Sequence, residues 1–132
     1  MKIEKTISLL LTACLASGTA AAAPVDDLLR DYQAAGAGPF TEASGARLWT
    51  QEHPEHEVPR SCATCHTPDP RKPGRHAVTG KAIEPLAPST NHKRLSERSE
   101  IDKWLLRNCK WTLGRECTAQ EKGDILTFLK AQ

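Results

Sequence analysis

The run Cys62-Ala63-Thr64-Cys65-His66 constrains this chain more than any other feature of its sequence. Two cysteines in C-x-x-C spacing, followed directly by a histidine, form the attachment signal of a c-type haem. Each thiol can add across one vinyl group of the porphyrin, and the histidine then lies under the ring and binds the iron. The same residue types also suit half of a zinc site or a thioredoxin-like redox pair. Features elsewhere in the sequence are needed to distinguish a haem site from a zinc site or a redox pair.

The N-terminus indicates that the protein is exported. Residues 1–22 combine lysines, a short apolar run and a stretch of alanines, which is the plan of a secretory signal peptide. We expect cleavage after Ala22 and a periplasmic protein made of residues 23–132, a single small domain. The alternative is a lipobox that ends at Cys14, which would tether the protein to a membrane. No other segment reaches the roughly 20 apolar residues of a membrane-spanning helix.

Charge and composition restrict the partners and the core. The whole chain carries a net charge of +2, so no basic surplus supports nucleic-acid binding. With two Phe and one Tyr, the domain is poor in core-forming residues, and a large planar apolar cofactor would supply the missing core. No carboxylate pair, Ser/His/Asp arrangement or phosphate-binding loop indicates an enzyme, although a reductase or oxygenase side activity stays open.

The remaining cysteines predict a disulfide. Of five cysteines, Cys14 lies in the leader and two belong to the haem motif, which leaves Cys109 and Cys117. Exported proteins permit disulfides, so we expect these two to form one. The chain-entropy model gives about 2–3 kcal/mol for so short a loop. A bridge at Cys109 would also hold its neighbour Asn108 in place.

Hydrophobic spacing predicts mainly helices. A first helix begins at Pro24 and stops before Gly36, and a second runs from about residue 41 to 52 with Gly45 inside it. Glycine inside a helix suggests that another backbone passes close by. The last helix begins at Thr118 with a capping box to Glu121, and its apolar face is expected to pack against the Gly45 segment.

The long connection after His66 is rich in proline and glycine and is expected to wrap the haem. Its apolar residues Ile83, Pro85 and Leu86 are predicted to belong to the haem wall. Two cations of the same connection, Arg75 and Lys81, either meet the haem propionates or face solvent.

A third helix is predicted to start at Ser99, where a capping-box-like pattern stands. Ile101, Trp104, Leu105 and Asn108 follow at i, i+3, i+4 and i+7, on one face. Trp104 and Leu105 are therefore predicted to line the haem. Asn108 projects an amide from the same stripe near the expected helix end, where it either faces the haem or caps the helix.

The sixth ligand of the iron cannot be methionine, because Met1 is the only one and leaves with the leader. The residues leave four alternatives, which are Asn108, His92, His76 and an open site.

Two sets of segments carry a family resemblance. Residues 45–49, the haem motif and the amphipathic C-terminal helix resemble a class I cytochrome c. More closely, Thr79-Gly80-Lys81, residues 85–89, Arg107-Asn108-Cys109 and residues 114–118 resemble the Sphaeroides haem protein group of oxygen-binding cytochromes c. The related cytochromes c double-prime have histidine before the first disulfide cysteine, where this chain has Asn108.

The resemblance implies a small all-α, class I-like cytochrome c fold around one covalent haem c, with an additional N-terminal helix. It implies His66 as proximal and Asn108 as distal ligand, transient O₂ binding, and electron exchange with a dihaem or multihaem cytochrome.

The ligand chemistry predicts a function. An amide oxygen is a weak, neutral ligand that suits ferric iron better than the softer ferrous ion, so reduction should release Asn108 and let O₂, NO or CO bind. The alternative is a plain electron carrier whose haem stays six-coordinate, with His92 or Asn108 as the distal ligand. In either case we expect a monomer without zinc.

Overall fold

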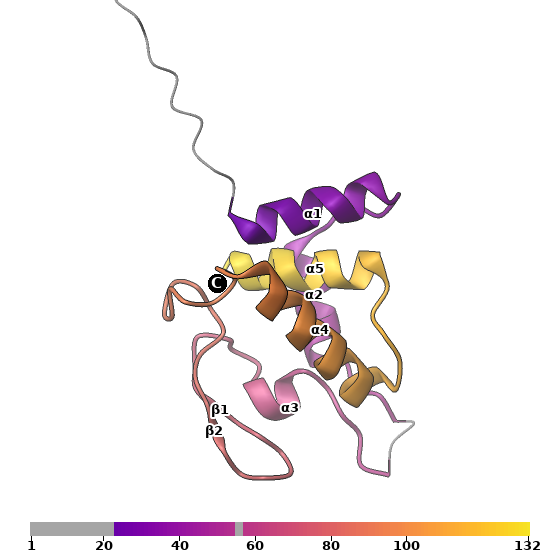
Figure 1. Ribbon diagram of the computed structural model, residues 1–132. Helices are drawn as coiled ribbons and strands as arrows, with labels where there is room; N and C mark the ends of the chain where they lie inside the picture. The colour runs from indigo at the N-terminus through magenta and orange to yellow at the C-terminus, as the bar shows by residue number, and fades with distance from the viewer. Residues whose placement is uncertain (1–22, 55–56) are drawn as a thin grey trace, which may run out of the picture.

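The computed structural model of the chain describes residues 23–54 and 57–132. Its elements, in order, are α1 (Pro24–Ala34), α2 (Glu42–Thr50), α3 (Ala63–His66), β1 (Gly74–Arg75), β2 (Ala82–Ile83), α4 (Arg98–Leu113) and α5 (Ala119–Lys130) (Figure 1). The fold is the predicted all-α fold with an additional N-terminal helix, apart from one short hairpin. The expected leader and Cys14 lie outside the described residues. None of the described helices is long and apolar enough to cross a membrane.

Helix α5 supplies side chains to both hydrophobic clusters of the core, and α2 crosses it at close range. At the crossing, a Cβ on Gly45 would collide with the carbonyl oxygen of Asp124 and with the side chain of Phe128. The predicted close approach at Gly45 is confirmed, and the contact requires glycine because any side chain would force the two backbones apart.

Both of these helices begin with a side-chain cap. In α2 the Thr41 hydroxyl accepts a hydrogen bond from the Ser44 backbone N–H. In α5 the Thr118 hydroxyl accepts from the Glu121 backbone, and the Glu121 carboxylate accepts from the Thr118 backbone, which is the predicted capping box.

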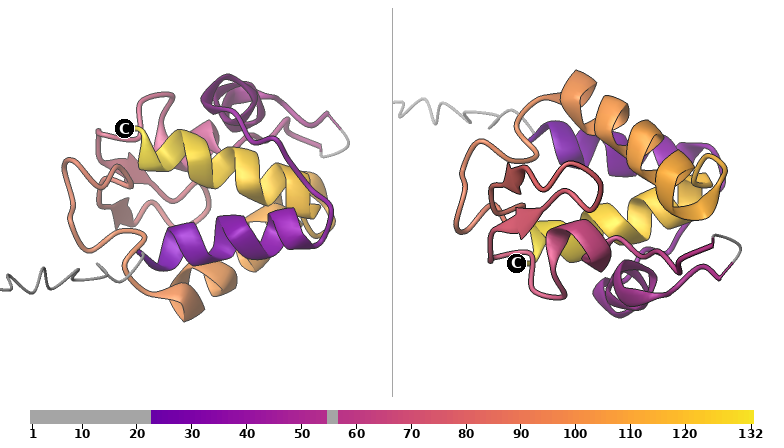
Figure 2. Two further views of the ribbon diagram at one scale, coloured as in Figure 1. Left: turned by 90° about the horizontal axis from the view of Figure 1, so that it is seen from above. Right: turned by 90° about the horizontal axis from the view of Figure 1, so that it is seen from below.

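The additional helix α1 packs against the outside of the α4–α5 pair (Figure 2). Its buried residues Val25 and Leu28 form one apolar cluster with Ile101 of α4 and Leu126 of α5. Two ion pairs also link it to the other helices, Lys130–Asp26 at 2.5 Å and Arg98–Asp31 at 2.7 Å. The apolar contacts are the main stabilising term here, since both ion pairs are at the surface.

Helix α4 differs from the prediction at both ends. It begins at Arg98, and Glu97 at the N-cap position makes no side-chain hydrogen bond, so the expected capping box at Ser99 is wrong. It ends only at Leu113, where Gly114 takes the left-handed conformation (φ +71°) that closes helices. Asn108 therefore lies inside the helix, and its alternative role as a C-terminal cap is wrong.

The connection between α3 and α4 is not wholly irregular. Strands β1 and β2 pair antiparallel, with Gly74 opposite Ile83 and Arg75 opposite Ala82. Gly74 lies against α3 so closely that a Cβ would collide with the carbonyl oxygen of Cys65. The hairpin is thus held directly against the haem motif.

Candidate functional site

The haem motif forms a short helix at the edge of a large cavity. Cys62 precedes α3, and both Cys62 and Cys65 are free thiols of intermediate exposure. Cys62, Cys65 and His66 line one cavity of about 820 Å³. We call these three residues the α3 side of the cavity.

Helix α4 also lines this cavity, and we call its residues Ile101, Trp104, Leu105 and Asn108 the α4 side of the cavity. All four come from the predicted face of the third helix. Figures 1 and 2 show α4 and α3 as separate elements, and both contribute residues to the lining of this cavity. The Asn108 side chain is half-buried, and its amide makes no hydrogen bond to any other described residue. The structure therefore brings the predicted proximal and distal residues to one cavity.

Burial controls the protonation of the α3 side. Mainly because of burial, and secondarily because of the charges of Arg94 and His76, the pKa of His66 falls to about 4. Its imidazole is therefore neutral at pH 7, which is the form that binds a metal ion. Burial also raises the pKa of the Cys62 thiol to about 11. Neither group carries a charge at neutral pH before the haem is attached.

Trp49 of α2 supports the segment that carries His66. The Trp49 ring is buried, with its centroid 5.6 Å from that of His66. Its indole Nε1 donates a 2.8 Å hydrogen bond to the carbonyl oxygen of Thr67. Thr67 has φ +64° and ψ 161°, a region that β-branched residues rarely adopt and that requires support from the surrounding structure.

The hairpin closes another part of the cavity. The backbone N–H of Ala77 donates to the Cys65 Sγ at 3.3 Å. His76 lines the cavity, and its Nδ1 accepts hydrogen bonds from the backbone N–H groups of Val78 and Thr79 at 3.3 and 3.1 Å. Since Nδ1 accepts these bonds, Nε2 is the ring nitrogen that carries a proton.

Of the five residues predicted to form the haem wall, four line the cavity. Ile83, Leu86, Trp104 and Leu105 line the cavity, whereas Pro85 does not. The carbonyl oxygen of Pro85 instead accepts a 2.9 Å hydrogen bond from Arg94 Nε, so this proline helps to fix the arginine that does reach the cavity.

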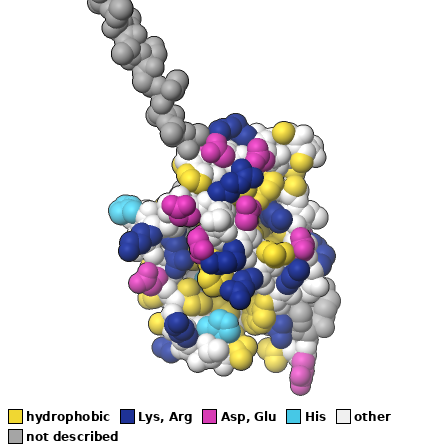
Figure 3. Space-filling model, in the orientation of Figure 1, with side chains coloured by type: hydrophobic (Ala, Val, Ile, Leu, Met, Phe, Trp, Pro, Cys, Tyr) yellow, Lys and Arg dark blue, Asp and Glu magenta, His cyan; other side chains and the backbone are white. Residues whose placement is uncertain are grey.

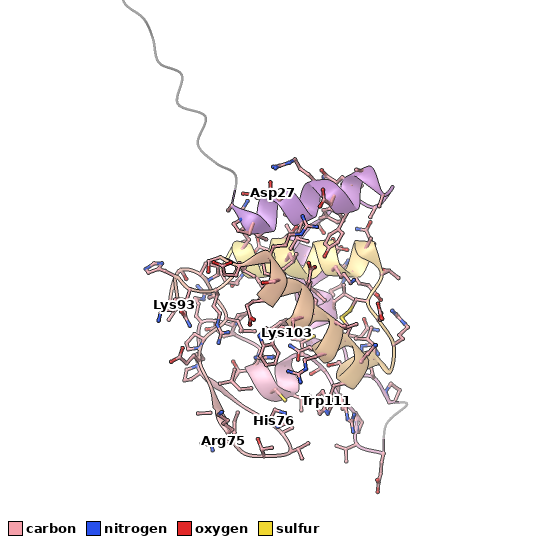
Figure 4. All side chains as sticks on the ribbon, in the orientation of Figure 1. Asp27, Arg75, His76, Lys93, Lys103 and Trp111 are labelled. Carbon is pink, nitrogen blue, oxygen red and sulfur yellow. A yellow bond between two sulfur atoms is a disulfide. The ribbon has the colours of Figure 1, made fainter. Side chains whose placement is uncertain are left out.

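The two candidate cations are placed differently from each other. Lys81 lines the cavity, but Arg75 does not and donates to the Gly80 carbonyl oxygen at 2.6 Å. Arg94 lines the cavity, with Nε and Nη2 bonded to the carbonyl oxygens of Pro85 and Glu84. On the face shown in Figure 3, hydrophobic side chains reach the surface, with Lys and Arg side chains around them; Figure 4 labels Lys93 and Lys103 on the same face.

The two candidate histidines are separated by the fold. Among the described residues that line the cavity, His76 is present and His92 is not. His92 is exposed on the connection before α4. Of the two, only His76 therefore faces the space in which a haem ligand must lie.

Sequence reasoning missed Trp49, Arg94 and Trp111 as cavity-lining residues. Trp49 was visible in the sequence only as part of the Gly45–Trp49 segment. Trp111 follows Asn108 by one turn and could have been included had the helix been predicted to continue to Leu113. No local signal marks Arg94, because its role depends on how the connection folds.

The cavity fits a covalent haem. A volume of about 820 Å³ lies within the range of roughly 300–1,000 Å³ typical of cofactor sites. Its lining combines two free thiols, one neutral imidazole, apolar walls and basic side chains that can face propionates. In addition, the Nδ1 atom of His66 is buried without a partner among the described residues, which is an arrangement that ordinarily calls for a further group or a local shift.

The Cys109–Cys117 disulfide joins α4 to the residues before α5. The two Cα atoms are 5.5 Å apart, and both cysteines are buried. Since Cys109 directly follows Asn108, the bridge restrains the part of α4 that carries the amide.

Comparison with known proteins agrees with this description. The chain is 41% identical over 128 residues to the cytochrome c-type protein SHP of Cereibacter sphaeroides, covering 94% of this chain and 97% of that protein. The solved structure of oxidized SHP, described as an oxygen-binding cytochrome c, superimposes with a TM-score of 0.75 at 38% identity and covers 82% of this chain and 96% of that one.

Oxidized cytochrome c'' from Methylophilus methylotrophus is also similar, with a TM-score of 0.73 at 28% identity over 83% of this chain and 94% of that one. Fold, cavity and relatives together define a c-type cytochrome with one covalent haem c. A family model described as a domain of unknown function (DUF1924) matches residues 35–129. The chain belongs to this family, and it is related in sequence to SHP and to cytochrome c''.

Proposed function

We propose that this protein is an exported monohaem electron-transfer cytochrome whose distal ligand, Asn108, is released on reduction so that O₂ or NO can bind. The observation that carries the proposal is the α4 side of the cavity. There the half-buried amide of Asn108 lines the same cavity as His66 and has no hydrogen-bond partner among the described residues. A polar group in that position is suited to an exchangeable bond.

In this proposal three residues hold the cofactor permanently. Cys62 and Cys65 form thioether bonds, and His66, kept neutral by burial, binds the iron on the α3 side. The haem supplies an iron that accepts one electron and, when ferrous, takes a diatomic ligand. The proposed exchange of a ligand, which would distinguish this protein from a plain electron carrier, then depends on the α4 side of the cavity.

Asn108 supplies a neutral amide oxygen, a weaker ligand than imidazole or thioether. It lies inside the continuous helix α4, next to the disulfide-bonded Cys109, so release would require a rotation of the side chain and no unwinding of α4. The freed amide then remains close enough to offer its N–H to the incoming ligand. The description of SHP as oxygen-binding supports this proposal.

The ferrous absorption spectrum of the wild-type protein is the first test. We expect a six-coordinate ferric and a five-coordinate high-spin ferrous haem that binds CO. A ferrous haem that stays low-spin and six-coordinate would instead support the alternative function, a plain electron carrier in which the distal ligand never leaves.

Substitution of Asn108 tests the assignment of the ligand. Asn108→Ala should give an open or water-bound ferric haem, and Asn108→His should give a tighter six-coordinate site that resists CO. His92→Ala is the matched control and should leave both spectra unchanged, because His92 does not reach the cavity. If His92→Ala removed the ferric low-spin signal while Asn108→Ala did not, the assignment to Asn108 would be wrong.

The proposal includes a cellular setting. Export to the periplasm follows from the leader-like residues 1–22, and the electron would come from a separate dihaem or multihaem cytochrome, with the protein acting as a monomer. Mass spectrometry of the periplasmic fraction tests the first of these points, since the mature chain should begin at Ala23 and carry one haem. A lipid on Cys14 would contradict it.

A further inference from the structure

Trp104 lies at the boundary between the cavity and solvent. It lines the cavity on the α4 side, one helical turn before Asn108, and yet 47% of its surface is exposed. By contrast, the cavity-lining residues of α5 are buried, with exposures of 6% for Ile125, 1% for Leu126 and 6% for Leu129. A small molecule therefore meets packed core on the α5 side and a partly solvated indole on the α4 side.

Charged neighbours contact the indole, and two of them, Glu100 and Arg107, also line the cavity. The indole Nε1 donates a 3.0 Å hydrogen bond to Glu100, and the same carboxylate accepts a 2.5 Å bond from Lys103. The Lys103 ammonium lies 5.2 Å and the Arg107 guanidinium 5.5 Å from the centre of the indole ring. All three partners are exposed (Figure 4 labels Lys103 on this face), so each contact is weak.

We propose that Trp104 is a gate through which a diatomic ligand passes between solvent and the space beside Asn108. This inference rests on the proposed function, because a gate matters only if the α4 side exchanges ligands. The closed position is the one observed, in which Glu100 holds the indole. Because the contacts that hold the ring are weak and exposed, rotation of the side chain opens the path without disturbing the buried core.

If Trp104 is a gate, its removal should change the rates of ligand association in a way that removal of a purely structural tryptophan would not. Removing the indole should speed the entry of any ligand, and it should help a bulky ligand more than a small one. A change in the iron itself, or in the release of Asn108, would instead alter the association of both ligands by similar factors.

The experiment measures association of CO and of n-butyl isocyanide with the ferrous holoprotein by flash photolysis. Trp104→Ala should raise the CO association rate constant about tenfold, and the isocyanide constant by a clearly larger factor. Leu106→Ala is the matched control, since Leu106 is an apolar residue of the same helix that is 38% exposed and does not line the cavity. Its rate constants should stay within about twofold of wild type.

Glu100→Ala provides a second test that keeps the indole and removes its acceptor. It should accelerate both ligands, by less than Trp104→Ala, and it carries the test if the alanine variant at Trp104 does not incorporate haem. Provided that the wild-type protein binds CO, two results overturn the gate. One is that Trp104→Ala and Glu100→Ala leave the association rate constants of CO and of the isocyanide at the level of Leu106→Ala. The other is that they raise the two constants by the same factor. If wild-type ferrous protein binds no CO, the proposed function itself fails, and the gate fails with it.

Discussion

Replacing Trp49 by phenylalanine should loosen the segment that carries the proximal histidine. The substitution keeps an aromatic ring next to Phe128, whose centroid lies 5.8 Å away, but it removes the N–H that bonds the Thr67 carbonyl oxygen at 2.8 Å. Thr67 immediately follows His66 and has the unfavourable φ of +64°. We therefore expect a loss of stability together with a change at His66.

The magnitude follows from two terms. The Thr67 carbonyl oxygen is part-buried, and its loss of the donor costs an amount in the lower half of the range of about 1–3 kcal/mol for a buried group. The missing part of the indole corresponds to roughly two methylene groups at about 0.8 kcal/mol each, since only 3% of Trp49 is exposed. Together they predict that the free energy of unfolding falls by about 3 kcal/mol, which lowers the melting temperature of a domain of this size by more than about 10 °C.

Guanidinium unfolding of the ferric holoprotein, followed by far-ultraviolet circular dichroism, measures this loss. Resonance Raman spectroscopy of the ferrous protein follows the iron–histidine stretch, which should shift or broaden. Trp104→Phe is the matched control, because its indole bonds a carboxylate at the surface and its loss should cost less than about 1 kcal/mol. Equal unfolding midpoints for Trp49→Phe and Trp104→Phe would refute the idea that Trp49 supports the His66 segment.

Three further predictions concern charge and the disulfide. The hydrogen bond from Arg115 lowers the pKa of Glu121 to about 2, below its value of about 4.3 in the unfolded chain. The Glu121 carboxylate therefore stabilises the folded state above pH 4–5, and this contribution is lost as the pH falls toward 2. Glu121→Gln should thus destabilise the protein by about 1–2 kcal/mol at pH 7 and by progressively less in urea titrations at lower pH; a difference independent of pH would contradict this. In redox titration, Arg94→Gln should lower the reduction potential of the haem by tens of millivolts, which is about the effect of one unit charge at an effective dielectric constant near 20. Arg75→Gln is the control and should leave the potential unchanged, because the Arg75 side chain lies outside the cavity. Reduction of the Cys109–Cys117 bridge should leave the haem attached and lower the free energy of unfolding by about 2–3 kcal/mol. It should also increase the high-spin fraction in the ferric absorption spectrum. An unchanged spin state would show that the bridge does not restrain Asn108.

The features that could be predicted from the sequence are those with local causes. The capping box at Thr118 depends on residues within one helical turn, and Gly45 marked a close crossing because glycine inside a helix is unfavourable without a reason. The face formed by Ile101, Trp104, Leu105 and Asn108 needed only the helical period, and all four residues line the cavity.

The errors also have physical causes. The pattern at Ser99 resembles a capping box, but α4 already begins at Arg98, which pairs with Asp31 of α1 through a tertiary contact that no local pattern shows. The end of the helix was readable from Gly114, whose left-handed conformation is a common helix terminator. The contribution of Arg94 depends on carbonyl oxygens of a folded loop, and only the structure shows which ones they are.

The two sides of the cavity are built for different degrees of movement. On the α3 side, the close contact of Gly74 with Cys65 and the bond from buried Trp49 to Thr67 hold His66 between packed elements. On the α4 side, the Asn108 amide has no hydrogen bond to another described residue. Moving a ligand on the α3 side would break buried contacts, whereas rotating the Asn108 side chain breaks no hydrogen bond to a described residue. If the iron exchanges a ligand, this difference confines the exchange to the α4 side, and the disulfide beside Asn108 keeps that movement within the side chain.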